Sequence, residues 1–165
     1  MKKSILTFLL LTATIFTSGC TKTKEIEPQL PQTDFTTTIT CGNEKYTVTH
    51  NGKSITSITI TEPEELNGLT YSYKGSVITL NYKSLSYTPS VNSLPATNSV
   101  TLLHNALCEV SAENFNSNFT IKTANSDTTI YESKTTEITC KTSTGNINQI
   151  KLKNNGKCYK FSNYS

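Results

Sequence analysis

The sequence predicts a mostly β protein of the α+β class, with a curved antiparallel sheet or half-barrel and one covering helix. Beyond residue 33, apolar residues recur at every second position, which is typical of half-buried strands. Glycine and asparagine residues separate these segments at short intervals, so consecutive strands are expected to pair antiparallel. Only residues 100–110 instead repeat their apolar residues at clear helical spacing.

The strand segments carry apolar residues on one side and small polar residues on the other. Ile58 and Ile60 share a face, and so do Ile78 and Leu80, while Thr, Ser and Asn occupy the alternate positions. One face of the sheet should therefore be covered and the other solvated. Strands are expected near residues 34–41, 44–50, 54–61, 69–74, 77–83, 118–124, 128–133, 136–142, 147–153 and 157–162.

The helical segment follows Pro95, where Asn98 or Ser99 can provide the N-cap. Its stripe consists of Val100, Leu103, Leu107 and Val110. Because the segment lies between five expected strands and five more, we expect the helix to cover the apolar face of the sheet. A second, short helical turn is expected at residues 63–66, where proline and two glutamates suit a first turn.

Residues 1–19 have the order of a signal peptide, with Lys2 and Lys3 before an apolar run and small residues at its end. Ser18-Gly19-Cys20 resembles the lipobox of bacterial lipoproteins, although Thr17 replaces the usual leucine. The resemblance implies that Cys20 receives a diacylglyceryl group and becomes the first residue. The apolar run of roughly 12 residues is too short for a transmembrane helix. We therefore expect a lipoprotein anchored by its acyl chains at the outer face of the cytoplasmic membrane.

Residues 20–33 are polar, contain two prolines and are expected to form a flexible tether behind the lipidated cysteine. Residues 34–165 are long enough for one domain. Removing Lys2 and Lys3 lowers the formal charge from +3 to +1, and the chain has no arginine. This composition makes nucleic acid an improbable partner and weakens any phosphate-binding hypothesis.

The segment from Glu62-Pro63-Glu64-Glu65-Leu66 to Thr70 resembles a recurrent segment of the LolA-like lipoprotein-carrier superfamily. The resemblance continues through residues 77–85, Leu94-Pro95 and the closing hairpins at residues 144–164. It covers residues 34–165 and implies a half-barrel with a helical lid. Because an N-terminal helix is not evident and a lipid anchor is expected, the chain looks more like the small membrane-anchored lipoproteins of Gram-positive bacteria. Such proteins are described as binding acyl chains or as scaffolding partner proteins.

Cys41, Cys108, Cys140 and Cys158 are candidate disulfide cysteines because an exported chain can be oxidised. Buried free thiols are the alternative. No close pair of cysteine ligands is present, so a metal site is not expected. The sequence also has no Gly-x-x-x-x-Gly-Lys-Ser phosphate loop, no Gly-x-Ser-x-Gly elbow and no His-Glu-x-x-His run, so no cofactor is expected. His104 and Cys108 share a helical face, but the sequence shows no third group that would orient them for catalysis. We therefore expect a protein that is not an enzyme.

Two functions are consistent with these features of the sequence. The first is a docking or scaffold module for another envelope protein. The alternative is a carrier that binds lipid acyl chains or another hydrophobic ligand in the half-barrel. A carrier needs a cavity, whereas a docking module closes the same space at native packing density. The candidate groove is formed by Ile58, Ile60, Ile78, Leu80, Val100, Leu103 and Leu107.

Overall fold

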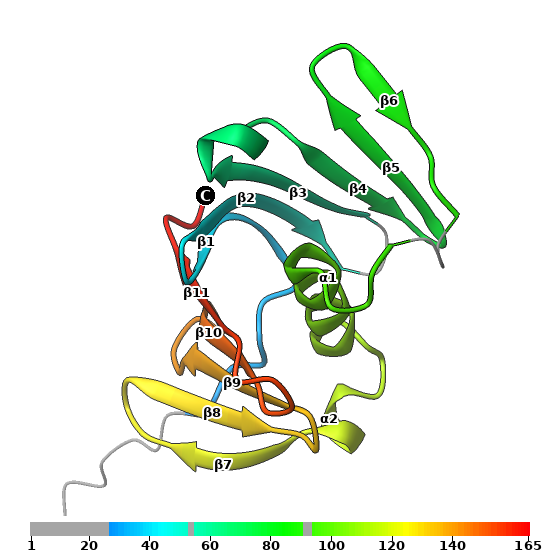
Figure 1. The fold of residues 1–165 in the computed structure, drawn as a ribbon. Helices are drawn as coiled ribbons and strands as arrows, with labels where there is room; N and C mark the ends of the chain where they lie inside the picture. The colour runs from blue at the N-terminus through cyan, green and yellow to red at the C-terminus, as the bar shows by residue number, and fades with distance from the viewer. Residues whose placement is uncertain (1–26, 53–54, 91–93) are drawn as a thin grey trace, which may run out of the picture.

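The computed structural model describes residues 27–52, 55–90 and 94–165. These residues form one curved, antiparallel sheet of eleven strands with helix α1 (Ser99–Val110) lying in its concave face (Figure 1). The predicted fold class is confirmed. The predicted signal peptide and Cys20 lie outside the described residues.

The order of the strands explains the position of the helix. The chain starts at the centre of the sheet with β1, runs outward strand by strand to the edge at β6, crosses to the opposite edge at β7, and returns to β11 beside β1. The bounds are β1 Asp34–Cys41, β2 Glu44–Asn51, β3 Ile55–Glu62, β4 Thr70–Lys74, β5 Val77–Tyr82, β6 Leu85–Tyr87, β7 Thr120–Ala124, β8 Thr128–Glu132, β9 Thr136–Lys141, β10 Ile147–Leu152 and β11 Cys158–Ser162. Because α1 belongs to the crossing between the two edges, it lies over the sheet and covers its apolar face.

The central strands pair as the alternating pattern requires. Tyr46 lies opposite Ile39 and Ile60, and Val48 lies opposite Ile58. Directly opposite residues of an antiparallel pair point to the same face, so these side chains form one continuous apolar layer. That layer packs against α1 in a single core cluster.

Most of the predicted elements agree with the structure within one or two residues, and two places need correction. Strand β6 has no counterpart among the expected strands, since three residues after a Lys83-Ser84 turn carry little periodic signal. The strand expected from residue 118 begins at Thr120, because Phe115–Asn118 forms the short helix α2. The expected turn after Pro63 is the 3-10 helix η1 (Glu64–Leu66).

Part of the predicted tether is packed against the domain. The backbone amide of Gln29 donates to the carbonyl of Thr142 at 3.0 Å, and that of Gln32 donates to the carbonyl of Gly145 at 2.8 Å. The hydroxyl of Tyr131 donates to the carbonyl of Gln29 at 3.0 Å. We call residues 29–32 the N-terminal strap. The prediction of a flexible tether through residue 33 is wrong for this strap, which is fixed on the domain by backbone hydrogen bonds.

Candidate functional site

The candidate groove residues meet between α1 and strands β3 and β5. Ile58, Leu103 and Leu107 have no exposed surface, and the exposed fractions of Val100, Ile60 and Ile78 do not exceed 5%. A side chain that lines a cavity wide enough for an acyl chain would keep accessible surface. Leu80 is only partly buried, and it lies opposite Tyr87 on the edge strand β6. The space under the centre of α1 is therefore filled by packed side chains.

The beginning of α1 is attached to β11. The side chain of Asn98 caps the helix by accepting from the amides of Val100 at 2.8 Å and Thr101 at 3.3 Å. Lys157 donates to the hydroxyl oxygen of Ser99 at 2.6 Å, and Tyr159 donates to the carbonyl of Ser99 at 2.9 Å. These contacts hold the first turn of the helix on the centre of the sheet.

The end of α1 is attached to two other parts of the sheet. The Glu109 carboxylate accepts hydrogen bonds from the hydroxyls of Ser133, Thr135 and Thr136, at 3.0, 3.2 and 2.7 Å. On the other side of the helix, the Ser111 hydroxyl lies 2.7 Å from Nε2 of His50 on β2. Helix α1 is thus fixed at both ends by polar contacts, in addition to its buried stripe.

His50 is the buried polar residue at the centre of this second attachment. Its Nδ1 lies 2.9 Å from the hydroxyl of Thr56, so both ring nitrogens have partners. Burial lowers the pKa of His50 to about 4, although the charge of Asp34 acts in the opposite direction. The imidazole is therefore neutral at pH 7, with one nitrogen donating and the other accepting. From the sequence, His50 can be placed only beside a hairpin turn, since its partner Ser111 is distant in the chain.

His104 and Cys108 lie side by side on α1, as their spacing predicts. The thiol sulfur is 3.5 Å from Nε2 of His104, and the imidazole stacks on the ring of Tyr73 with centroids 3.7 Å apart. Burial lowers the pKa of His104 to about 4 and raises that of Cys108. The pair is therefore a neutral imidazole beside a neutral thiol. A nucleophilic cysteine needs the thiolate, which this environment disfavours.

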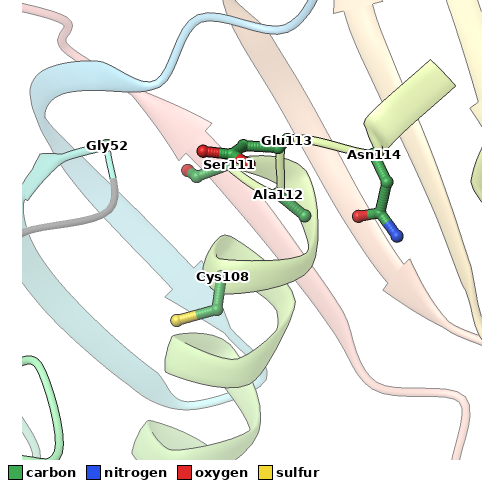
Figure 2. Close-up of a pocket in the computed structure, with 6 residues that line it drawn as sticks. All are labelled: Gly52, Cys108, Ser111, Ala112, Glu113 and Asn114. Carbon is green, nitrogen blue, oxygen red and sulfur yellow. The ribbon is translucent and has the colours of Figure 1, made fainter.

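A cleft of about 520 Å³ opens at the end of α1 (Figure 2). Its lining combines small and polar residues with the Cys108 thiol, and consists of Gly52, Cys108, Ser111, Ala112, Glu113 and Asn114. The volume is in the range of small-molecule sites. None of the seven candidate groove residues lines this cleft, so the groove expected from the sequence and the cleft are different places.

The four candidate disulfide cysteines are free in the structure. Cys41 and Cys158 lie on neighbouring strands, and the amide of Cys158 donates to the Cys41 thiol. The register places Lys160 opposite Thr40, so Tyr159 rather than Cys158 is opposite Cys41. Burial raises the pKa of Cys140 to about 12, which identifies a core thiol. A disulfide stays a prediction, and a Cys41–Cys158 bridge would need a local shift because the two positions face opposite sides of the sheet.

Among the described residues, no three His, Cys, Asp or Glu side chains gather as a metal site would require. Within the same ranges, none of the helices combines the length and the apolarity needed to cross a membrane.

Comparisons with known proteins find a similarity in structure only. No protein-family model matches the sequence, and no curated protein matches it. Among solved structures, the chain is similar to the LolA superfamily protein NE2245 from Nitrosomonas europaea. The TM-score is 0.39 and the sequence identity 13%, over 86% of this chain and 88% of that one. The chain thus has a structural neighbour in that superfamily, at a distance that leaves its function to be argued from its own residues.

Proposed function

We propose that the chain is a membrane-anchored, extracytoplasmic lipoprotein that acts as a non-catalytic docking or scaffold module for another envelope protein. The observation that supports this proposal most directly is the filled concave face. Leu103 and Leu107 have no exposed surface, and neither does Ile58 on the facing strand. A carrier would need space between these side chains.

The attachment of α1 supports the same function. A lid that admits an acyl chain must move away from the sheet, which here would break the contacts of Ser99, Glu109 and Ser111 as well as the packing of the helical stripe. Each of these hydrogen bonds contributes about 1 kcal/mol, and the bonds to the charged carboxylate more. Moving α1 away from the sheet is therefore costly. The same fixed attachment of α1 favours a docking module, which needs a rigid binding surface.

Among the described residues, His104 and Cys108 are the pair considered from the sequence as a possible nucleophile and base, and their environment does not activate the thiol. Cys108 has a raised pKa and its neighbour His104 a lowered one, so the proton stays on the thiol at pH 7. The two side chains therefore pack against each other and are not suited to acid–base catalysis. Membrane anchoring itself rests on the resemblance of residues 18–20 to a lipobox.

The decisive experiment compares stability with lipid retention in single variants of α1. Leu103→Ala and Leu107→Ala should each lower the free energy of unfolding by about 2 to 5 kcal/mol, because each leaves a cavity in a packed core. Neither should change the retention of a fluorescent fatty acid. Leu102→Ala is the matched control, since Leu102 is on the same helix and only partly buried, and should cost less.

A carrier predicts the reverse result. The two truncations would then cost the empty protein little and would weaken lipid retention. Native mass spectrometry of the chain released gently from membranes gives a second readout, because it separates a co-purifying protein from a co-purifying lipid. A stoichiometric lipid in this measurement would contradict the docking proposal.

Binding of lipid or another hydrophobic ligand is the second candidate function. The cleft beside Cys108 is the observation that favours it, since its volume suits a small or partly inserted ligand. Binding there would leave Leu103→Ala without effect on retention, while a bulky substitution such as Ala112→Phe would abolish it.

A further inference from the structure

The two edges of the sheet are protected to different degrees. The β7 edge carries Lys122, whose amine lies 2.7 Å from the Glu137 carboxylate and 3.9 Å from that of Glu132. Charged side chains of this kind prevent edge strands from pairing with other chains. The β6 edge has no charged residue in its three positions, and two of them are apolar and exposed: Leu85 at 72% and Tyr87 at 64%.

The hairpin between β5 and β6 determines which backbone groups of β6 are free. Tyr82 lies opposite Leu85 across a two-residue turn, and Leu80 lies opposite Tyr87. The closing pair of such a hairpin exchanges hydrogen bonds, and hydrogen-bonded pairs alternate along the ladder. Leu85 and Tyr87 therefore direct their amides and carbonyls toward β5. Ser86, between them, directs its own amide and carbonyl away from β5. Strand β6 is the outermost strand at this end of the sheet (Figure 1).

We propose that the β6 edge pairs with the same edge of a second copy of this chain, antiparallel about a two-fold axis at Ser86. In this register Ser86 lies opposite its own equivalent and exchanges two backbone hydrogen bonds with it. Leu85 lies opposite Tyr87 of the second copy, and Tyr87 lies opposite Leu85. The edge is thus self-complementary, as a two-fold interface requires.

The side chains agree with this register. Leu85 and Tyr87 point to the same face as their β5 partners Tyr82 and Leu80, so pairing would extend an existing apolar strip into the second copy. The Leu–Tyr pairs would occupy the non-hydrogen-bonded positions, where side chains approach most closely. Ser86 points to the other face, and no charge of one copy is placed opposite a like charge of the other.

The pairing geometry is independent of the lipid anchor, and only its strength in cells rests on the proposed anchoring. A three-residue strand offers a small contact. Two copies held in one bilayer meet at a raised effective concentration, which compensates for a weak interface.

The test introduces a positive or a negative charge at Ser86 in the full chain, which is purified in mild detergent. Ser86→Lys and Ser86→Glu each place like charges opposite one another only in the dimer, so each should weaken dimerisation by about tenfold or more in native mass spectrometry or sedimentation equilibrium. An equimolar mixture of the two variants should restore a dimer that contains one copy of each. Thr123→Lys on the exposed β7 edge is the matched control and should leave dimerisation unchanged.

A wild-type chain that remains monomeric at all concentrations would overturn the proposal, and so would a dimer that is insensitive to both Ser86 variants. Open-ended oligomers that Thr123→Lys abolishes would also overturn it, because they would indicate pairing of β6 with β7. Repeating the measurement with Cys20→Ser separates the two ideas: loss of membrane partitioning in this variant supports the anchoring, while an unchanged Ser86 effect supports the pairing on its own.

Discussion

The Nε2 atom of His50 lies 2.7 Å from the Oγ atom of Ser111, so strand β2 and the end of α1 share a buried hydrogen bond. The two residues are 61 positions apart in the chain. The bond is formed with a neutral imidazole, since burial lowers the pKa of His50 to about 4. The stability of the domain should therefore depend on pH through this residue.

We expect the free energy of unfolding to fall as the pH is lowered from about 6.5 to about 4. In this window the unfolded chain, whose histidines have pKa values near 6.5, binds protons that the folded chain does not. The contribution of His50 is lost over this window and amounts to about 3 kcal/mol at most. Urea unfolding of wild type and His50→Gln at a series of pH values measures it. A wild-type curve that runs parallel to that of His50→Gln would show that His50 does not titrate as proposed.

Gly145 should be required for the N-terminal strap. Its φ is +72°, and a Cβ at this position would overlap the backbone carbonyl of Leu30. Gly156 has a φ of +71° but nothing within 4 Å, so it is a matched control for the backbone strain alone. Both alanine variants should lose about 1 to 2 kcal/mol through that strain.

Only Gly145→Ala should also release the strap. Hydrogen exchange should then accelerate at the amides of Gln29 and Gln32 in this variant and not in Gly156→Ala. Equal exchange in the two variants would mean that the strap tolerates displacement at Gly145.

Asn98 should contribute to stability as the N-cap of α1. Asn98→Ala removes the acceptor for the amides of Val100 and Thr101 and should cost about 1 kcal/mol. Asn98→Ser should retain most of this energy. Asn105→Ala, at an exposed position in the same helix, should be neutral or slightly stabilising because alanine favours helix. Thermal unfolding of the three variants would refute the cap if Asn98→Ala were as stable as Asn98→Ser.

Cys20 should carry the membrane anchor. The mature chain is expected to begin at Cys20 with a diacylglyceryl group, because residues 18–20 resemble a lipobox. Two buried acyl chains are needed for stable anchoring, at about 0.8 kcal/mol per CH₂. Intact mass and membrane partitioning of wild type and Cys20→Ser measure this directly. A mature mass without acyl chains would disprove it.

The sequence by itself determined most of the elements of this fold, with the exception of strand β6 and the short helix α2. Alternation of apolar residues at 57–61 or 77–82 is a local property, and so is the stripe of Val100, Leu103 and Leu107. A strand or helix buries one face at a fixed period, so the pattern reveals it without any knowledge of its neighbours. The same two patterns also predicted that one face of the sheet is covered and that the helix of residues 100–110 covers it.

The tertiary structure alone decided how the helix is held and where space remains. The bond between His50 and Ser111 depends on which strand faces the end of α1, and no local pattern encodes that. The same holds for the strap, since the polar composition of residues 20–33 suggests flexibility, although backbone groups of Gln29 and Gln32 are hydrogen-bonded to the distant β9–β10 turn. Backbone hydrogen bonds do not depend on side-chain type, so composition cannot reveal them. The filling of the groove was likewise decided by how closely α1 approaches β3, since the same leucines can pack together or line a cavity.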